Sequence, residues 1–399
     1  MRSRYAGVIA AGAVLSLGMA AASAIPAAAS PRAVPGAGGA PAPVAAALAV
    51  ASVAAPAVAP VVASVTPDVS LDQAWREYGD SGGQGSWAGA DGTYSVPIPG
   101  GHDAWLFNDT FLGPVNADES LPSTAGAIHN SAVLSSPRAT QIGTFITGGT
   151  RQDPQPLVSP PASGATASDW YWNTDGIVDQ GHLYVFEQEN GHIDSPPPFD
   201  FGQTGMAIAK FSLPGMHLES VTPTYGGTDV SWGVQLLREG PWIYIYGVEN
   251  GGGLAGDQVH LARARTGHLL GPWQFSTGSG WSSDPAASAP LLGGVGASYG
   301  VARVDGQYVL ATTGSFLNPQ IYLYTAPTPA GPFTGGTKIY TPPEASGSIY
   351  TYNVAVHPEL TGPGKLVLSY NVNSSNVAEL YANINNNRAR FITVSFARP

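Results

Sequence analysis

Carboxylate side chains recur at the ends of short apolar segments, and they are the groups in this chain best suited to chemistry. Asp91 and Asp175 open such segments, whereas Asp109, Glu187 and Glu249 close them. The 399-residue chain has no cysteine, which excludes thiol catalysis, disulfides and cysteine-based metal centres. Two carboxyl groups across a cleft can cleave a glycosidic bond: one protonates the leaving oxygen, and the other activates water or attacks the anomeric carbon. The pattern therefore favours glycosidic hydrolysis.

Aromatic and amide side chains near the same segment ends could hold a sugar. The apolar face of a sugar ring packs on aromatic rings, while its hydroxyls reach polar neighbours. We expect these residues to contact substrate: Asn130, Trp172, Trp232, Tyr299, Tyr352 and Asn371. Each of these residues also has a structural interpretation. An Asp can stabilise a turn or cap a loop, and a Glu at a strand end can simply face solvent. Asn130 can form a hydrogen bond within a loop.

Histidines and glycines give no sign of a metal or phosphate site. No histidine pair has helical metal-binding spacing, and no phosphate-binding glycine motif precedes a helix. His102, His182 and His357 fall near predicted turns, where we expect structural or solvent-facing roles. We predict no catalytic metal and no required cofactor. A structural Ca²⁺ in the central funnel stays an open alternative.

Five segments share one pattern, in which a polar or aromatic residue opens an alternating strand, followed by a tight turn and a second apolar strand. Their opening residues are Asp91, Asp175, Trp232, Tyr299 and Tyr352. A third strand and usually a fourth follow each pair. Four-stranded units repeated radially are propeller blades, so we predict an all-β fold: a five-bladed β-propeller of four-stranded antiparallel blades. A two-sheet sandwich, the alternative, does not explain the recurrence.

Loop lengths indicate which end of this propeller carries the site. The turns within the strand pairs are short, whereas the links at the opposite end are long: 112–129, 159–174, 188–203 and 278–295. Long loops on one face of a rigid scaffold are where binding residues usually lie. We therefore expect the five carboxylates to meet there, at the mouth of the central funnel. Asp179 and Asp305 fall in tight turns at the other end and are read as turn residues.

The N-terminal region is predicted to direct export. Arg2 and Arg4 precede an apolar run and a small-residue cleavage pattern, so residues 1–24 read as a signal peptide, with a retained membrane anchor as the alternative. Residues 25–67 read as an Ala/Pro-rich linker, and 68–399 as the propeller domain. The net charge of −11 argues against nucleic acid and anionic membranes. We expect a secreted monomer without membrane contact after cleavage.

Several short motifs follow one another in a fixed order along the predicted propeller. The first motif reads Trp-Leu-Phe-Asn-Asp-Thr-Phe-Leu-Gly over 105–113. The others are the segments 175–178, 231–233, 244–247, 357–359 and 369–373. In their order, these motifs resemble those of the five-bladed β-propeller glycoside hydrolases of family 43. They are more similar to secreted bacterial propellers described as domain of unknown function 4185, some of which are endo-D-arabinanases of glycoside hydrolase family 183.

The resemblance implies a hydrolase of a neutral, furanose-containing, arabinan-like polysaccharide. Asp91 or Asp109 would be base or nucleophile, Asp175 would orient or tune, and Glu249 or Glu187 would be the acid.

Two positions depart from the families' pattern. Asn108 replaces the usual glycine before Asp109, and Glu249 matches the blade of the family 43 acid but not its strand position. Two further interpretations stay open: a non-catalytic carbohydrate-binding propeller, and a cell-surface adhesion module.

Overall fold

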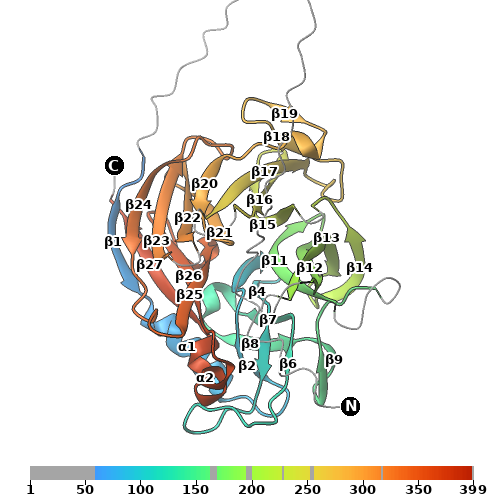
Figure 1. The fold of residues 1–399 in the computed structure, drawn as a ribbon, viewed down its shortest axis with the longest axis vertical. Helices are drawn as coiled ribbons and strands as arrows, with labels where there is room; N and C mark the ends of the chain where they lie inside the picture. Colours follow the sequence, from blue (N-terminus) through green and yellow to red (C-terminus); the bar gives the residue numbers. More distant parts are fainter. Residues whose placement is uncertain are drawn as a thin grey trace, which may run out of the picture.

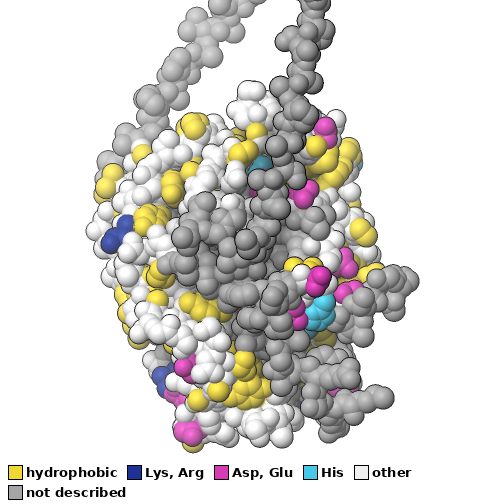
Figure 2. Space-filling view, viewed as in Figure 1, with side chains coloured by type: hydrophobic (Ala, Val, Ile, Leu, Met, Phe, Trp, Pro, Cys, Tyr) yellow, Lys and Arg dark blue, Asp and Glu magenta, His cyan; other side chains and the backbone are white. Residues whose placement is uncertain are grey.

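The computed structural model describes residues 59–161, 169–194, 200–226, 229–251, 256–315 and 318–397. The expected signal peptide, and the expected linker up to residue 58, lie outside these residues. Strands dominate, and five sheets of four or more strands surround a common centre (Figure 1). None of the helices in the described ranges has the length and apolar character needed to cross a membrane. The face seen in Figure 2 carries few Lys and Arg side chains.

The first two sheets follow the chain from the inside outwards. The first consists of β3 (Tyr94–Ile98), β4 (His102–Phe107), β7 (Ser131–Ser135) and β8 (Ile142–Ile146). The second consists of β11 (Trp170–Asp179), β12 (His182–His192), β13 (Phe201–Ser212) and β14 (His217–Pro223). Antiparallel pairing joins each strand to the next.

The third and fourth sheets repeat this order. The third consists of β15 (Val230–Glu239), β16 (Trp242–Glu249), β17 (Asp257–Arg265), β18 (Gln274–Ser276) and β19 (Trp281–Ser282), with β20 (Leu292–Val295) paired to β17. The fourth consists of β21 (Tyr299–Val304), β22 (Gln307–Ser315), β23 (Asn318–Ala326) and β24 (Thr334–Tyr340).

The fifth sheet combines both ends of the described chain. It consists of β25 (Ile349–His357), β26 (Lys365–Ser374), β27 (Ala389–Phe396) and β1 (Val62–Pro67). Figure 1 shows β1, in blue, beside β27, in red. The domain therefore begins before Asp68, and the expected boundary there is wrong. The surrounding alanine and proline residues suggested a linker, but the segment contains β-branched residues that favour a strand. Its Val62 and Val65 pack against the fifth sheet.

Small elements complete the fold. Two small sheets are formed by β2 (Trp87–Ala90), β5 (Thr110–Leu112) and β6 (Ala127–Ile128), and by β9 (Gly148–Thr150) and β10 (Asp153–Gln155). The helices are α1 (Val69–Asp80) and α2 (Val377–Ala382), with 3-10 turns η1 (Pro137–Ala139), η3 (Pro285–Ala287), η4 (Pro358–Leu360) and η5 (Ile384–Asn387). The Asp68 side chain caps α1 by accepting a hydrogen bond from the Leu71 amide, at 3.2 Å.

The innermost strands contact one another in a closed ring, in the order β3, β11, β15, β21, β25 and back to β3. This arrangement confirms the predicted all-β propeller. Apolar side chains from neighbouring sheets form the cores between them: Phe186 and Ile245 pack between the second and third sheets, and Val309 and Leu368 between the fourth and fifth. Each fully buried side chain of this kind stabilises the fold by about 1.5–3 kcal/mol.

We predict that a chain beginning at Asp68 is less stable than one beginning at Ala59, because only the second keeps β1 on the edge of β27. Each lost backbone hydrogen bond costs about 1 kcal/mol, and losing a few should lower Tm by roughly 5–10 °C. Thermal unfolding followed by circular dichroism measures the difference. Equal melting temperatures would show that β1 is dispensable.

Candidate functional site

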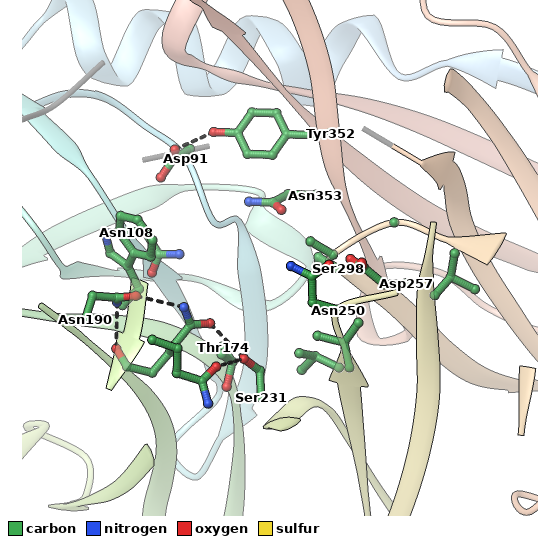
Figure 3. Close-up of a pocket in the computed structure, with 18 of the residues that line it drawn as sticks. Asp91, Asn108, Thr174, Asn190, Ser231, Asn250, Asp257, Ser298, Tyr352 and Asn353 are labelled. Atoms are coloured by element: carbon green, nitrogen blue, oxygen red, sulfur yellow. Dashed lines mark hydrogen bonds between the residues drawn. The ribbon is translucent and has the colours of Figure 1, made fainter. Parts of the chain in front are cut away.

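A cavity of about 250 Å³ opens on the axis, where the innermost strands begin. Every blade contributes to its lining: Asp91, Thr174, Ser231, Ser298 and Asn353 come from the first to the fifth in turn (Figure 3). The structure thus has a cavity at the end where the sequence predicts the site.

Asp91 is the first carboxylate of this cavity and is 4% exposed. Its Oδ2 accepts a hydrogen bond from the Tyr352 hydroxyl. Burial, and then the neighbouring Asp109, raise the pKa of Asp91 to about 7. The next residue, Gly92, has a φ of 61°, and a Cβ there would lie 2.5 Å from Nδ2 of Asn108. The turn that presents Asp91 therefore requires glycine.

Asp109 lies behind the cavity rather than in its lining. Its Oδ1 is 2.9 Å from Nδ1 of His129 and accepts a hydrogen bond from Nε1 of Trp172 at 3.1 Å. The His129 ring stacks on Trp170, with 5.0 Å between centroids. Asp109 thus positions Trp172, which lines the cavity, and places negative charge near Asp91. The sequence did not single out His129 as a partner of Asp109.

Asp257, the first residue of β17, is a second carboxylate of the cavity and was missed by the sequence analysis. It lies on the other side from Asp91, near Asn250 and Ser298 (Figure 3). It accepts a hydrogen bond from the Gly251 amide at 3.2 Å, and burial raises its pKa to about 6. The sequence did contain a signal for this residue, because Asp257 follows a glycine-rich loop and opens an apolar segment.

Amides and hydroxyls form much of the remaining wall. Gln188 donates to Oδ1 of Asn190 at 2.8 Å and accepts from the Ser231 hydroxyl at 3.1 Å. The other amide residues of the lining are Asn108, Asn173, Gln203, Asn250 and Asn353. Among the described residues, the acids of the lining are Asp91, Asp229 and Asp257, and no Lys, Arg or Glu takes part. Such a wall can exchange many hydrogen bonds with a neutral polar ligand.

Asp175 does not face this cavity, contrary to expectation. A bulge in β11 between Asn173 and Gly176 turns Thr174 towards the cavity and Asp175 away from it. The Asp175 carboxylate accepts hydrogen bonds from the amides of Gly176 and Leu236, both at 2.7 Å, and from Nε2 of Gln235 at 2.8 Å. It therefore ties the second blade to the third.

The two glutamates expected as the acid also lie elsewhere. Glu187 is 0% exposed, and neither carboxylate oxygen has a hydrogen-bond partner among the described residues. Burial raises its pKa well above the usual value. Glu249 is 41% exposed and pairs with Nε2 of His260 at 2.8 Å. Its neighbours Val248 and Asn250 line the cavity, so strand alternation turns Glu249 away.

Of the expected sugar-binding residues, Trp172 and Tyr352 line the cavity. The other four do not, because each is buried in structural contacts. Asn130 donates to the carbonyls of Val158 and Tyr171, and Asn371 donates to Oγ1 of Thr93. The Tyr299 hydroxyl donates to the Gly247 carbonyl, and Trp232 packs on Phe275 in an inter-blade core.

No three His, Asp or Glu side chains gather to hold a metal ion in the ranges that the structure describes. The structural Ca²⁺ stays a prediction without an assigned ligand set.

Residues 72–396 match the family model described as Domain of unknown function (DUF5005). The chain belongs to this family. This family differs from the domain of unknown function 4185, which the motifs resemble, although its match covers the same stretch of the chain. No curated protein matches the chain.

Comparison with solved structures finds a shared fold. A Bacteroides ovatus protein with the provisional description of a hydrolase has a TM-score of 0.68 at 20% identity, covering 83% of this chain and 90% of that one. For an exo-β-1,3-galactanase from Phanerochaete chrysosporium, the TM-score is 0.46 at 11% identity, and the match covers 78% of this chain and 63% of that one. A GH43_1 enzyme from Xanthomonas citri, complexed with xylose, scores 0.44 at 11% identity, covering 82% and 93%. At 20% identity, the first likeness concerns the fold and not the activity.

We predict that Glu187→Gln stabilises the protein at pH 8 by about 1 kcal/mol or more, because it removes a buried acid without a partner. The folded state holds the Glu187 proton above pH 4.5, where the unfolded chain releases it, so the parent loses stability as pH rises. The variant and parent should have similar stability near pH 4. Urea unfolding at both pH values, with Glu249→Gln as control, measures this. A destabilised variant at pH 8 would contradict it.

Proposed function

We propose that the protein is a glycoside hydrolase whose reaction takes place in the amide-lined axial cavity. One observation carries the proposal: the carboxyl groups of Asp91 and Asp257 lie on opposite sides of one cavity (Figure 3). Paired carboxyl groups across a sugar site are the arrangement that glycosidic cleavage needs. The provisional description of the Bacteroides ovatus protein agrees with this class of reaction.

The two carboxyl groups differ in pKa, and this difference assigns one as the proton donor and the other as the base. Because the pKa of Asp257 is about 6 and that of Asp91 is about 7, Asp257 ionises first as the pH rises, and Asp91 keeps its proton to higher pH. Asp91 donates that proton to the leaving oxygen as the glycosidic bond breaks. Asp257 accepts a proton from the water that attacks the anomeric carbon. This reverses the part expected for Asp91, because burial and Asp109 raise its pKa.

The lining favours a neutral polysaccharide. The ionised Asp257 would repel an acidic sugar, and the described lining residues include no Lys or Arg. Trp172 offers an aromatic surface, and the amides offer partners for hydroxyls. The resemblance to arabinan-cleaving propellers makes a furanose-containing, arabinan-like polymer the first substrate to test. We further propose that the enzyme is secreted after cleavage of the N-terminal signal.

A non-catalytic carbohydrate-binding propeller is the second candidate. The observation that favours it is the absence of any glutamate among the described residues of the lining, since Glu249 and Glu187 both point elsewhere. Such a protein would keep the amides and Trp172 but would release no product.

We predict that Asp91→Asn and Asp257→Asn each lower kcat about 10³-fold or more, since each removes a proton-transfer group while keeping its shape. KM should change little. The measurement is the release of reducing ends from a panel of neutral polysaccharides that includes arabinan, with Glu249→Gln as the charge-matched control. Unchanged turnover in both variants would remove these residues from the mechanism. Binding without hydrolysis by the parent, weakened by Trp172→Ala, would establish the second candidate.

We predict a bell-shaped dependence of kcat/KM on pH, with its maximum between about pH 6 and about 7. Below this range Asp257 becomes protonated and loses its function as base. Above it, Asp91 loses the proton that it must donate. Because the Tyr352 hydrogen bond lowers the pKa of Asp91, Tyr352→Phe should move the alkaline limb upwards, while Tyr299→Phe leaves it in place. An alkaline limb that Tyr352→Phe does not move would separate Asp91 from the proton donor.

A further inference from the structure

A second cavity, of about 490 Å³, lies further along the axis than the candidate active site. Along β3, β11, β15 and β25, the residues that line the first cavity precede those that line the second. Tyr94 and Val234 line both and therefore mark the boundary between them. The second cavity thus belongs to the opposite half of the axis, where the tight turns lie.

The walls of this second cavity are mainly apolar. The apolar and aromatic lining residues are Tyr94, Val96, Pro97, Ile177, Val178, Val234, Leu236, Tyr299, Ala355, Val356 and Pro358. Two carboxyl groups, Asp175 and Glu359, interrupt this surface. Arg238 is the lining cation, but its guanidinium already binds Oδ1 of Asp179 at 3.0 Å and the Val178 carbonyl at 2.7 Å.

The two carboxyl groups differ in how well they are satisfied. Three donors occupy the two oxygens of Asp175. The Glu359 side chain is 10% exposed and accepts a hydrogen bond from the Ser95 hydroxyl. In the described part of the chain, no Lys or Arg forms an ion pair with Glu359. Burial raises the pKa of Glu359 to about 8, in keeping with a carboxylate that lacks a counter-charge.

His357 does not supply that counter-charge. Its Nδ1 lies 2.6 Å from Oγ of Ser95, and its Nε2 lies 2.8 Å from Oγ of Ser369. Burial lowers its pKa to about 3, so the imidazole stays neutral. A positive charge near Glu359 would therefore have to come from a ligand.

We infer that the second cavity binds a small organic cation, with a primary ammonium group against Glu359 and an apolar body against the valines and tyrosines. An ammonium donates to a carboxylate through charge-assisted hydrogen bonds, and aromatic rings attract it further. The apolar wall suits an alkyl body better than a hydrated metal ion, which seeks several oxygen ligands. This site is independent of the proposed hydrolysis.

The test uses the full chain and n-butylammonium chloride, with n-butanol as the neutral analogue of equal length. At about pH 9 Glu359 is ionised while an alkylamine keeps its proton. Isothermal titration calorimetry should show one saturable site for n-butylammonium and at least tenfold weaker binding of n-butanol. Equal affinity for the two compounds, or no saturable binding of n-butylammonium, would overturn the inference.

Glu359→Gln should weaken n-butylammonium binding at least tenfold, because it keeps the side-chain shape and removes the charge. Glu219→Gln is the matched control, since it removes the same charge from the Lys210 pair on the outer strand β14. If Glu359→Gln fails to fold, Pro97→Trp decides: Pro97 is exposed and lines the cavity, so the larger ring should block entry. Binding unchanged in either folded variant would overturn the inference.

Discussion

The pairing of β1 with β27 completes the last blade of the ring and joins the two ends of the described chain in one sheet. The innermost strands surround the axis in a closed ring, which ends where β25 of the fifth blade contacts β3 of the first. Residues 62–67 provide the outer strand of the fifth blade, and Val62 and Val65 join the core of the fifth sheet. Without this pairing, β27 would expose a row of unpaired backbone groups. Pairing at this outer edge therefore stabilises the blade next to the ring closure, and the ring encloses the axial cavities.

Bulges in the innermost strands then determine which side chains reach each cavity. Register shifts follow Asn173 in β11, Trp232 in β15 and Tyr352 in β25, at corresponding places in three blades. Near each shift, the chain passes from residues that line the first cavity to residues that line the second. Asp175 is turned towards the third blade, whose Gln235 in turn accepts a hydrogen bond from the Val301 amide of the fourth at 2.9 Å. The same irregularity that shapes the cavities links neighbouring blades.

The sequence predicted what depends on period and repetition. Alternating strands, tight turns and recurrent openings sufficed to predict a propeller and the end that carries the amide-lined cavity. They did not suffice for side-chain direction, because a bulge changes the face of every residue near it. Asp175 was therefore misplaced, and Trp232 was expected to contact substrate although it fills a core. Asp257 was missed because its apolar segment is a third strand rather than the opening of a blade.

The charges of the axis follow from how burial acts on carboxyl groups in this fold. The chain has few basic residues. The buried acids along the axis, Asp91, Asp175 and Glu359, accept hydrogen bonds from backbone amides, an amide side chain and hydroxyls rather than from Lys or Arg. Desolvation then outweighs these hydrogen bonds, and the pKa rises to about 7 at Asp91 and about 8 at Glu359. Protons are therefore held near neutral pH in both halves of the axis. In the amide-lined half, Asp91 can transfer its proton to a leaving group. In the apolar half, a bound cation can displace the proton of Glu359. One physical cause thus suits the two cavities to different ligands.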